Sequence, residues 1–295
     1  MREHKSFFHS CATIVVTGMK GAFSMHKKIR MIVSDLDGTM VDDTFQIPED
    51  NIKAVKEASA RGVLVTIATG RMYCSALPYA RRLGIDVPLI AYNGAIVKTV
   101  GGERISAEFL PSDVVKNVLR FIFEHGWYVQ LYREGKLYYA EATEAALAYE
   151  KASGVPGNAV GEEGLLERTD EVPKLLVVTK DEASGDEALA MLSEKFPTEI
   201  MAMKSKSNYI EVVVPGVSKA KAVIALAEKH GIAADEIMAL GDSGNDVSML
   251  KACGLGVAMG NATEAVKAEA DAVTGICEKG GVAEAIYRYV LEDRQ

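Results

Sequence analysis

The sequence of 295 residues has no run of about 18 consecutive apolar residues, which a membrane-spanning helix needs. It is also short of positive charge, because 33 Lys and Arg stand against 41 Asp and Glu, for a formal net charge of −8. Surfaces that bind nucleic acid are normally basic, so we expect neither a membrane nor a nucleic-acid partner. A small anionic substrate stays compatible with this balance, because a metal ion or local lysines can reverse the potential inside a pocket.

Cysteine and histidine are scarce as well. The four cysteines form no C-x-x-C pair, and the five histidines show no H-E-x-x-H or similar ligand spacing. These absences argue against a zinc site and against a disulfide framework. Isolated thiols are typical of a reducing compartment, so we expect a cytoplasmic protein.

Residues 1–24 have a basic start and a short apolar stretch, which weakly resembles a secretory signal peptide. The apolar stretch is broken by polar residues and by Gly18, and no A-x-A cleavage site follows. Met25 opens a second segment that leads directly into an apolar run. We therefore expect residues 1–24 to be an N-terminal extension outside the fold, with secretion as the less favoured alternative.

From residue 27 onward, apolar runs alternate with amphipathic helical patterns. The apolar runs KIRMIVSD, VLVTIATG and PLIAYNGA are separated by helical segments such as IPEDNIKAVKEASARG. The same alternation returns near the C-terminus with KAKAVIALAEKHG, EIMALGDSG and GLGVAMG. This pattern predicts an α/β fold with a Rossmann-like, doubly wound parallel sheet.

The stretch 96–207 has a different pattern. WYVQLYREGKLYYA alternates around a Glu-Gly turn, which predicts an antiparallel hairpin, and helical segments lie before and after it. We interpret this stretch as an α+β cap domain inserted into the sheet domain. The expected domains are a catalytic core at 25–95 and 208–295 and an α/β cap at 96–207 that selects the substrate.

The most informative motif is DLDGT at 35–39, at the end of the first apolar run. Asp35 and Asp37 are two residues apart, so on a strand both carboxylates point into one site. Open α/β sheets bind ligands at the carboxyl ends of their strands. Gly38 permits a sharp turn close to an anion, and the Thr39 hydroxyl is suited to phosphate oxygens. A calcium loop also uses D-x-D-G, but its twelfth position requires a glutamate that this sequence lacks.

A second acidic motif, GDSGND at 241–246, directly follows the apolar run EIMAL. Asp242 and Asp246 therefore stand at another strand end, where they can share a Mg²⁺ with the first pair. Proteins usually hold Mg²⁺ with one or two carboxylates together with water and substrate phosphate, and these residues supply the carboxylates. Taken alone, the same residues also suit an ordinary loop.

Two weaker signals complete the set. The Thr69 hydroxyl and the backbone N–H of Gly70 precede a helix, where they form a phosphate cradle. Lys219 starts another helix and, taken alone, resembles any surface lysine. Carboxylates and phosphate in contact repel one another by several kcal/mol at an effective dielectric of about 20. One Mg²⁺ and one lysine nearly offset the four acidic residues, which is the neutralisation that phosphoryl transfer needs.

The order of these motifs, DLDGT, ATGR, a lone lysine before a helix and GDSGND, resembles the haloacid dehalogenase (HAD) superfamily. More narrowly, YNGA, VPGVSKAKAV and VAMGNATEAVKAEADAVT resemble its Cof-type phosphatase branch, which carries a large α/β cap between the second and third motifs. The resemblance covers residues ~27–290 and is specific in order as well as content. The departures are Ala220, where the branch often has glycine, and the extra N-terminus; neither touches the chemistry.

The resemblance implies a role for each matching residue. Asp35 would be the nucleophile that forms an aspartyl phosphate, and Asp37 would act first as acid and then as base. The residues implied for Mg²⁺ are Asp35, Asp37, Asp242 and, as ligand or support, Asp246. The residues expected to bind phosphoryl oxygens are Thr39, Thr69, Gly70, Lys219 and Asn245. Those expected near the substrate are Arg71, Asn93 and Gly94.

The sequence thus predicts Mg²⁺-dependent hydrolysis of a small phosphorylated metabolite, a sugar phosphate or a related monoester. A phosphomutase is the nearest alternative, but such mutases usually carry a helical cap between the first two motifs, where only about thirty residues lie here. A binding sensor without turnover is another alternative, against which the intact Asp37 argues.

The sequence indicates neither the physiological substrate nor the oligomeric state. Tyr128, Tyr132 and Tyr138 belong to the hairpin of the cap. They either line a pocket for a ring or pack one face of the cap sheet. We expect packing, because aromatic side chains usually fill cores.

Overall fold

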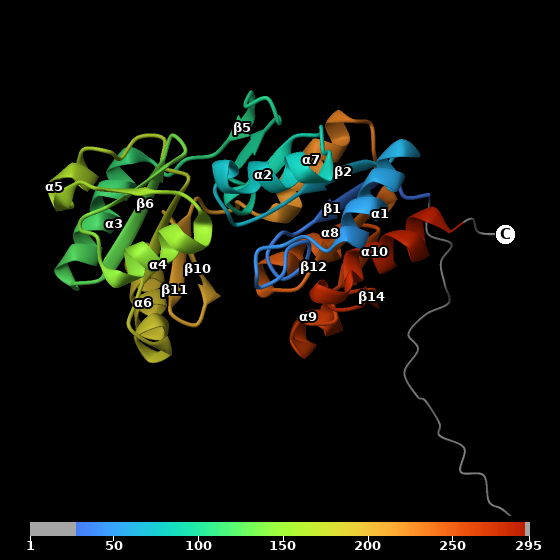
Figure 1. Ribbon diagram of the computed structural model, residues 1–295. Helices are drawn as coiled ribbons and strands as arrows, with labels where there is room; N and C mark the ends of the chain where they lie inside the picture. The colour runs from blue at the N-terminus through green and yellow to red at the C-terminus, as the bar shows by residue number, and fades with distance from the viewer. Residues whose placement is uncertain (1–27, 293–295) are drawn as a thin grey trace, which may run out of the picture.

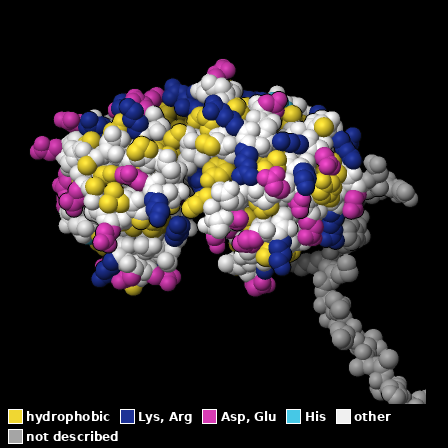
Figure 2. Space-filling model, viewed as in Figure 1, with side chains coloured by type: hydrophobic (Ala, Val, Ile, Leu, Met, Phe, Trp, Pro, Cys, Tyr) yellow, Lys and Arg dark blue, Asp and Glu magenta, His cyan; other side chains and the backbone are white. Residues whose placement is uncertain are grey.

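The computed structural model describes residues 28–292, so the expected extension at 1–24 lies outside the described residues. Two lobes lie side by side (Figure 1). One lobe holds a parallel sheet built from the first and last parts of the chain, and the other is built from the middle of the chain. The space-filling view shows a notch between the two lobes (Figure 2).

The parallel sheet has the strand order β14-β13-β12-β1-β2. Every residue of β1 and β12 is buried, as the continuous apolar runs of a doubly covered parallel sheet require. The strands are β1 (Met31–Ser34), β2 (Leu64–Ile67), β12 (Ile237–Gly241), β13 (Leu255–Ala258) and β14 (Ala272–Val273).

Helices cover both faces of this sheet. The chain crosses from β1 to β2 in one direction and from β12 to β13 in the other, and right-handed crossovers then place the connecting helices on opposite faces. In agreement, α1 packs on α10 and α7 packs on α8. The helices of this lobe are α1 (Glu49–Ala60), α2 (Tyr73–Leu83), α7 (Lys219–Lys229), α8 (Val247–Ala252), α9 (Glu264–Glu269) and α10 (Gly281–Ile286). The short 3₁₀ helices are η1 (Tyr92–Gly94), η2 (Ala234–Glu236), η3 (Gly244–Asp246) and η4 (Cys277–Lys279), and η5 (Tyr287–Leu291) is a π-helix. The predicted doubly wound α/β fold is confirmed.

The second lobe contains a sheet of order β10-β11-β9-β6-β7-β8. Its neighbouring strands are antiparallel except for β7 and β8. The predicted hairpin is formed by β6 and β7, and both turn residues, Glu134 and Gly135, have the positive φ that a tight two-residue turn requires. The strands are β6 (Tyr128–Arg133), β7 (Lys136–Tyr139), β8 (Gly157–Ala159), β9 (Lys174–Val178), β10 (Met201–Lys206) and β11 (Tyr209–Val213).

Helices α3, α5 and α6 cover one face of this sheet, and the other face is turned toward the core lobe. The expectation that the hairpin tyrosines share a face is wrong. Tyr132 is paired with Leu137, whereas Tyr138 is paired with Leu131, and neighbouring positions on a strand alternate between faces. Tyr132 therefore packs toward the core, and Tyr138 packs beneath the helices. The helices of this lobe are α3 (Ser112–Glu124), α4 (Glu144–Ser153), α5 (Gly161–Leu166) and α6 (Glu182–Lys195).

A small antiparallel sheet joins β3 (Leu89–Ala91), β4 (Ile96–Lys98) and β5 (Arg104–Ala107). The expected domain limits at 96 and 208 stay a proposal, which the strand pairing refines. Strands β4 and β5 lie in the expected cap range but pair with β3, and β11 lies in the expected core range but pairs with β9 and β10. Alternation of apolar residues does not say which sheet a strand joins. We propose that the cap begins and ends at the connections 108–111 and 214–218.

Among residues 28–292, no helix has the length and apolar character needed to cross a membrane.

Candidate active site

Asp35, Thr69 and Asp242 each follow a strand of the parallel sheet. Strand β1 lies between β12 and β2, and the three strands run in the same direction. Their carboxyl ends therefore meet at one edge, where the N–H of Asp35 donates to the carbonyl of Leu240 over 2.9 Å. This topology brings together motifs that are about 200 residues apart in the chain.

Lys219 lies between two of the predicted carboxylates. The Ser218 hydroxyl caps the first turn of α7, so the helix begins at Lys219 and directs its side chain into the site. Its Nζ donates to Oδ1 of Asp35 over 2.5 Å and to Oδ1 of Asp246 over 2.7 Å. Burial favours the neutral amine, but the charges of Asp246 and Asp35 outweigh it and raise the pKa of Lys219. Lys219 is therefore a buried cation.

Three carboxylates meet at this point, with oxygens of Asp35, Asp242 and Asp246 all within 4.8 Å of one another. Burial raises the pKa of Asp35 well above its ordinary range and raises the pKa of Asp242 to about 6. When all three carboxylates are ionised, the single positive charge of Lys219 leaves a local charge of −2, and this uncompensated charge adds to burial in raising the two pKa values. A divalent cation brings this charge to zero, and carboxylate oxygens are the ligands that Mg²⁺ prefers, so the donor set fits Mg²⁺.

Both oxygens of the Asp246 carboxylate already have partners in the chain. Oδ1 accepts from Lys219, and Oδ2 accepts from the backbone N–H groups of Asp242 and Ser243 over 3.1 and 3.0 Å. The side chain is fully buried. Asp246 thus holds the lysine and the loop that carries Asp242.

The Asp37 carboxylate is bound by Arg71 and lies outside the group of three. The guanidinium Nε donates to Oδ2 of Asp37 over 2.7 Å, and Nη2 donates to Oδ1. The guanidinium also stacks over the rings of Phe45 and Tyr79, at 5.5 and 5.2 Å from the centroids. The Asp37 side chain is 52% exposed and the Arg71 side chain 12%. The structure therefore places Asp37 at the open side of the site and Asp35 at its buried side.

Thr39 and Gly38 both adjoin Asp242. The sequence predicts that the Thr39 hydroxyl binds phosphate, but in the structure this buried hydroxyl donates to Oδ1 of Asp242 over 2.7 Å. Gly38 has φ of +73°, and a Cβ at this position would lie 2.6 Å from Oδ2 of Asp242. Only glycine leaves room for the carboxylate, so both residues set its position.

The predicted phosphate-binding residues lie around Asn93. The Thr69 hydroxyl accepts from the N–H of Arg71 over 3.1 Å, and the Thr69 carbonyl accepts from the N–H of Asn93 over 2.9 Å. Asn245 donates from Nδ2 to Oδ1 of Asn93 over 3.1 Å. A Cβ at Gly70 would lie 3.1 Å from the same oxygen. The structure thus brings the ATGR and GDSGND segments together through Asn93.

Gly94 joins this group to the start of α7. Its φ is +108°, and a Cβ here would lie 2.4 Å from the carbonyl oxygen of Ser218. Close backbone packing at this point requires glycine. Gly94 thereby sets the distance between Asn93 and Lys219 without offering a side chain of its own.

Two charged residues at this edge were missed from the sequence. Glu211 on β11 accepts from Nδ2 of Asn93 over 2.6 Å, and Lys174 on β9 donates to the carbonyl of Gly70 over 3.1 Å. Lys174 and Glu211 also bind each other over 3.0 Å. The available signal was a single charged residue within or beside each of the apolar runs KLLVV and YIEVV, at a position that strand alternation turns inward.

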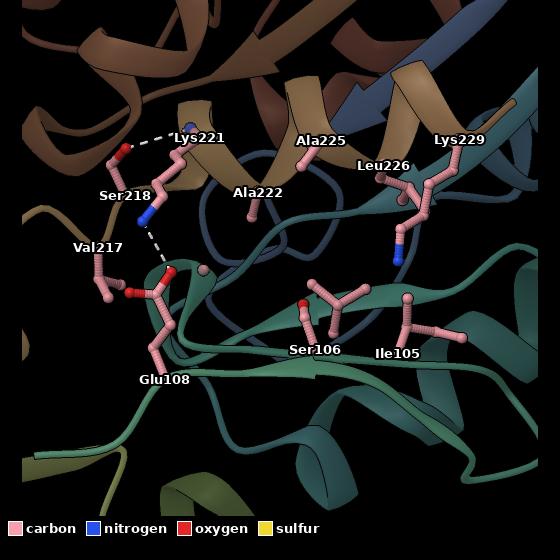
Figure 3. Close-up of a pocket in the computed structure, with 12 residues that line it drawn as sticks. Ile105, Ser106, Glu108, Val217, Ser218, Lys221, Ala222, Ala225, Leu226 and Lys229 are labelled. Atoms are coloured by element: carbon pink, nitrogen blue, oxygen red, sulfur yellow. Dashed lines mark hydrogen bonds and ion pairs between the residues drawn. The ribbon is translucent and has the colours of Figure 1, made fainter. Parts of the chain in front are cut away.

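A separate pocket of about 210 Å³ lies between α7 and the hairpin of β4 and β5 (Figure 3). Ile105 and Leu226 contribute apolar walls, and an ion pair of 2.9 Å joins Glu108 to Lys221. None of the three clustered carboxylates lines this pocket. The chemistry suggested by the acidic residues therefore belongs to the strand ends and not to this pocket.

Comparison with known proteins agrees with the motif order. The family model for haloacid dehalogenase-like hydrolases matches residues 32–286. The 5-amino-6-(5-phospho-D-ribitylamino)uracil phosphatase YcsE of Bacillus subtilis is 32% identical over 263 residues, which are 89% of this chain and 96% of that protein. Both the span of the family match and this identity are large enough to establish membership.

Solved structures extend the likeness to the whole architecture. TM0651 from Thermotoga maritima superposes with a TM-score of 0.78 at 33% identity, covering 88% of this chain and 97% of that one. The sugar phosphatase BT4131, of HAD subclass IIB, gives a TM-score of 0.78 at 28% identity, with coverage of 88% and 98%. The chain belongs to the haloacid dehalogenase-like hydrolase family, in its Cof-type branch with an inserted cap.

Proposed function

We propose that this protein is a Mg²⁺-dependent phosphatase that hydrolyses small phosphate monoesters through a phosphorylated Asp35. The observation that carries this proposal is the charge of the site, where Asp35, Asp242 and Asp246 lie together and Lys219, paired with Asp35 and Asp246, is the one cation bound to them among residues 28–292. A site left with a charge of −2 repels a phosphate ester until a divalent cation binds. The membership in a hydrolase family with phosphatase relatives supports the same activity.

In the first half-reaction, a carboxylate oxygen of Asp35 attacks phosphorus, and the bond from phosphorus to the ester oxygen breaks. Lys219 is hydrogen-bonded to the Asp35 carboxylate, so its positive charge lies close to the phosphoryl group during the attack and stabilises the negative charge there. Asp37, at the open side, gives its proton to the departing alcohol. The products of this half-reaction are the alcohol and an aspartyl phosphate.

In the second half-reaction, water attacks the phosphorus of the aspartyl phosphate and loses a proton to Asp37. The bond between phosphorus and the Asp35 oxygen breaks, which restores the carboxylate and releases inorganic phosphate. Arg71 donates hydrogen bonds to both Asp37 oxygens, so we propose that Arg71 orients the Asp37 carboxyl group for both proton transfers. Thr69, Gly70 and Asn245 are proposed to hold the phosphoryl oxygens.

Asp35, Asp242 and the backbone carbonyl of Asp37 would hold Mg²⁺, with Asp246 in support. When bound, this ion supplies the positive charge that lets a carboxylate approach a phosphate ester. Thr39 and Gly38 set the position of Asp242, as their contacts with its oxygens suggest.

For the substrate, we propose a phosphorylated polyol or sugar. YcsE is named for a ribitylaminouracil phosphate and BT4131 for sugar phosphates, and this chain resembles both along nearly its whole length. The phosphomutase alternative is less favoured, because the segment between Asp37 and Thr69 holds only α1, β2 and their connections, without a cap.

The test is release of inorganic phosphate from an aryl phosphate, from 5-amino-6-(5-phospho-D-ribitylamino)uracil and from a panel of sugar phosphates, with Mg²⁺ and with EDTA. We expect phosphate release that depends on Mg²⁺ and that vanishes in Asp35→Asn. Binding of phosphorylated compounds without release would support a sensor, and conversion of one sugar phosphate isomer into another would support a mutase. Either result would replace the proposed phosphatase activity.

A further inference from the structure

The contact between the two lobes contains a buried ion pair that belongs to the cap. Lys174 of β9 and Glu211 of β11 lie on the cap face that is turned toward the core, and their side chains are 3% and 8% exposed. The Lys174 Nζ lies 4.9 Å from the centroid of the Tyr132 ring on the neighbouring strand. Both charges are therefore removed from solvent at the junction of cap and core.

Each member of this pair binds one of the core segments around the site. Lys174 donates to the carbonyl of Gly70 over 3.1 Å, and Glu211 accepts from Nδ2 of Asn93 over 2.6 Å. The two segments come from different parts of the core, one after β2 and one after β3. One ion pair on the cap thus contacts both at once.

The pair has all the partners that it needs within the protein. No buried polar side-chain atom of Lys174, Glu211 or Asn93 lacks a hydrogen bond among the described residues. Burial favours the neutral form of Lys174, but the Glu211 charge outweighs it and raises the lysine pKa. Because the ion pair is fully hydrogen-bonded within the protein, it needs no ligand to compensate its charges. Its role therefore depends on its contacts with the core.

The contact with Glu211 fixes which way the Asn93 side-chain amide faces. An ionised glutamate only accepts hydrogen bonds, so the amide nitrogen of Asn93 must face Glu211. The amide oxygen is then turned toward Asn245, whose Nδ2 donates to it over 3.1 Å. Glu211 therefore orients Asn93, and Asn93 orients Asn245, which is one of the residues proposed to bind the phosphoryl group.

We propose that Lys174 and Glu211 form a latch by which the docked cap sets the orientation of Asn93 and Asn245. This inference rests on the proposed phosphatase function, because it treats the Asn245 amide as a phosphoryl-binding group. Lys174 and Glu211 are positioning residues, since neither one contacts the carboxylates at the strand ends. Strand β11, which carries Glu211, ends directly before the connection 214–218, and Lys219 directly follows it. Movement of the cap about this connection would therefore separate Glu211 from Asn93.

The first test replaces the pair with apolar side chains of similar length, Lys174→Met together with Glu211→Met. Replacing both partners of a buried ion pair leaves stability nearly unchanged or increases it, so this variant is expected to fold. Without the Glu211 acceptor the Asn93 amide loses its fixed orientation. We expect kcat to fall by about tenfold to a hundredfold, as misplacement of a binding group by about 1 Å does.

The single variant Glu211→Gln tests the orientation itself. The two Glu211 oxygens accept from different donors, Lys174 and Asn93, whereas a glutamine has one amide oxygen. The lysine ammonium has only donors and therefore binds that oxygen, which leaves the glutamine nitrogen facing the Asn93 nitrogen, and two facing donors favour rotation of the Asn93 amide. We expect a fall in kcat of similar size. The matched control is Lys204→Met with Asp186→Asn, which removes an ion pair between β10 and α6 of the same cap and is expected to leave kcat unchanged.

Amide hydrogen exchange gives a readout that does not depend on activity. Exchange is expected to quicken in segments 69–71 and 92–94 of the double variant and to stay unchanged in the control. A double variant that matches the parent in both kcat and exchange would overturn the latch. If the parent releases no phosphate from any substrate, the proposed function fails, and the exchange rates alone then decide whether the cap pair orders these segments.

Discussion

Arg71 binds the Asp37 carboxylate through both of its oxygens, with Nε donating to Oδ2 over 2.7 Å and Nη2 donating to Oδ1. The two residues belong to different motifs and follow neighbouring strands of the sheet. Asp37 is half exposed, so without Arg71 its carboxylate would be free to rotate in solvent. The two hydrogen bonds from Arg71 therefore hold Asp37, the proposed acid and base, in one conformation.

Substitution of Arg71 by lysine keeps the charge but loses the two parallel hydrogen bonds. A lysine ammonium does not fix a carboxylate plane, so we expect kcat to fall by about tenfold to a hundredfold. The measurement is steady-state hydrolysis of an aryl phosphate. The control is Arg82→Lys in α2, the helix that begins just after Arg71, because the pair of Arg82 with Glu49 is exposed. Equal activity of Arg71→Lys and the parent would show that Asp37 needs no such support.

Asp35→Asn preserves the shape of the side chain and replaces the carboxylate that we propose as nucleophile with a neutral amide. We expect turnover to fall by ~10³-fold or more, with binding of the substrate largely kept. Single-turnover phosphate release and calorimetric titration of a substrate measure the two effects separately. Asp43→Asn, in the exposed loop that follows the motif, is the control and should retain activity. Turnover near the parent level in Asp35→Asn would reject Asp35 as the nucleophile.

Lys219→Met removes the cation that, in the part of the chain that the structure describes, contacts both Asp35 and Asp246. Both carboxylates are buried, and breaking a buried ion pair by removing one partner typically costs about 3–5 kcal/mol. We expect that loss in the free energy of unfolding in urea, measured with EDTA present. The control is Lys221→Met, on the same helix as Lys219, which removes an exposed ion pair with Glu108. For this exposed pair a cost of about 0–1 kcal/mol is expected. A cost for Lys219→Met as small as that for Lys221→Met would contradict the buried position of this charge.

The stabilisation by Mg²⁺ is expected to grow with pH. Burial raises the pKa of Asp242 from 3.8 to about 6. Between these values the folded protein keeps a proton that the unfolded chain has lost, so the metal-free protein loses stability as pH rises from about 4 to about 6. Mg²⁺ binds the ionised form, so the shift in unfolding midpoint that it causes should be small near pH 5 and larger near pH 7.5.

Thermal unfolding with Mg²⁺ and with EDTA at these two values of pH checks this expectation. Asp242→Asn is the control variant, because it removes the titrating group and a proposed ligand together. Its midpoint should respond weakly to Mg²⁺ at both values. An equal response of the parent at both values would show that Mg²⁺ binding is not linked to this carboxylate.

Gly38→Ala is expected to weaken Mg²⁺ binding, because the new methyl group would lie 2.6 Å from Oδ2 of Asp242 and displace this carboxylate. Disturbing a residue that positions a ligand typically lowers metal affinity by about 10–100-fold. The measurement is the Mg²⁺ concentration at half-maximal activity. Gly62→Ala is the matched control, since Gly62 also has positive φ, +79°, but a Cβ there meets nothing within 4 Å. A similar effect of both substitutions would assign the loss to backbone strain.

Local sequence patterns were sufficient for the main elements of the fold. The apolar runs before Asp35 and Asp242 become the buried strands β1 and β12, because a run bounded by turn-forming residues has few other ways to bury its side chains. The hairpin of β6 and β7 follows from alternation around a Glu-Gly turn. Strand β11 was not assigned to the cap sheet, since its apolar pattern suits either sheet and only its partners distinguish them.

The sequence by itself determined which residues meet at the proposed site, because DLDGT, ATGR and GDSGND place acidic, hydroxyl and amide groups directly after strands, and parallel strands end at one edge of a sheet. Only the tertiary structure decided the partners of these groups. The pairing of Asp37 with Arg71, the use of the Thr39 hydroxyl by Asp242 and the contact of Glu211 with Asn93 all join residues that are distant in the chain. Such hydrogen bonds depend on how strands and lobes pack, and no local pattern of residues encodes a distance between them.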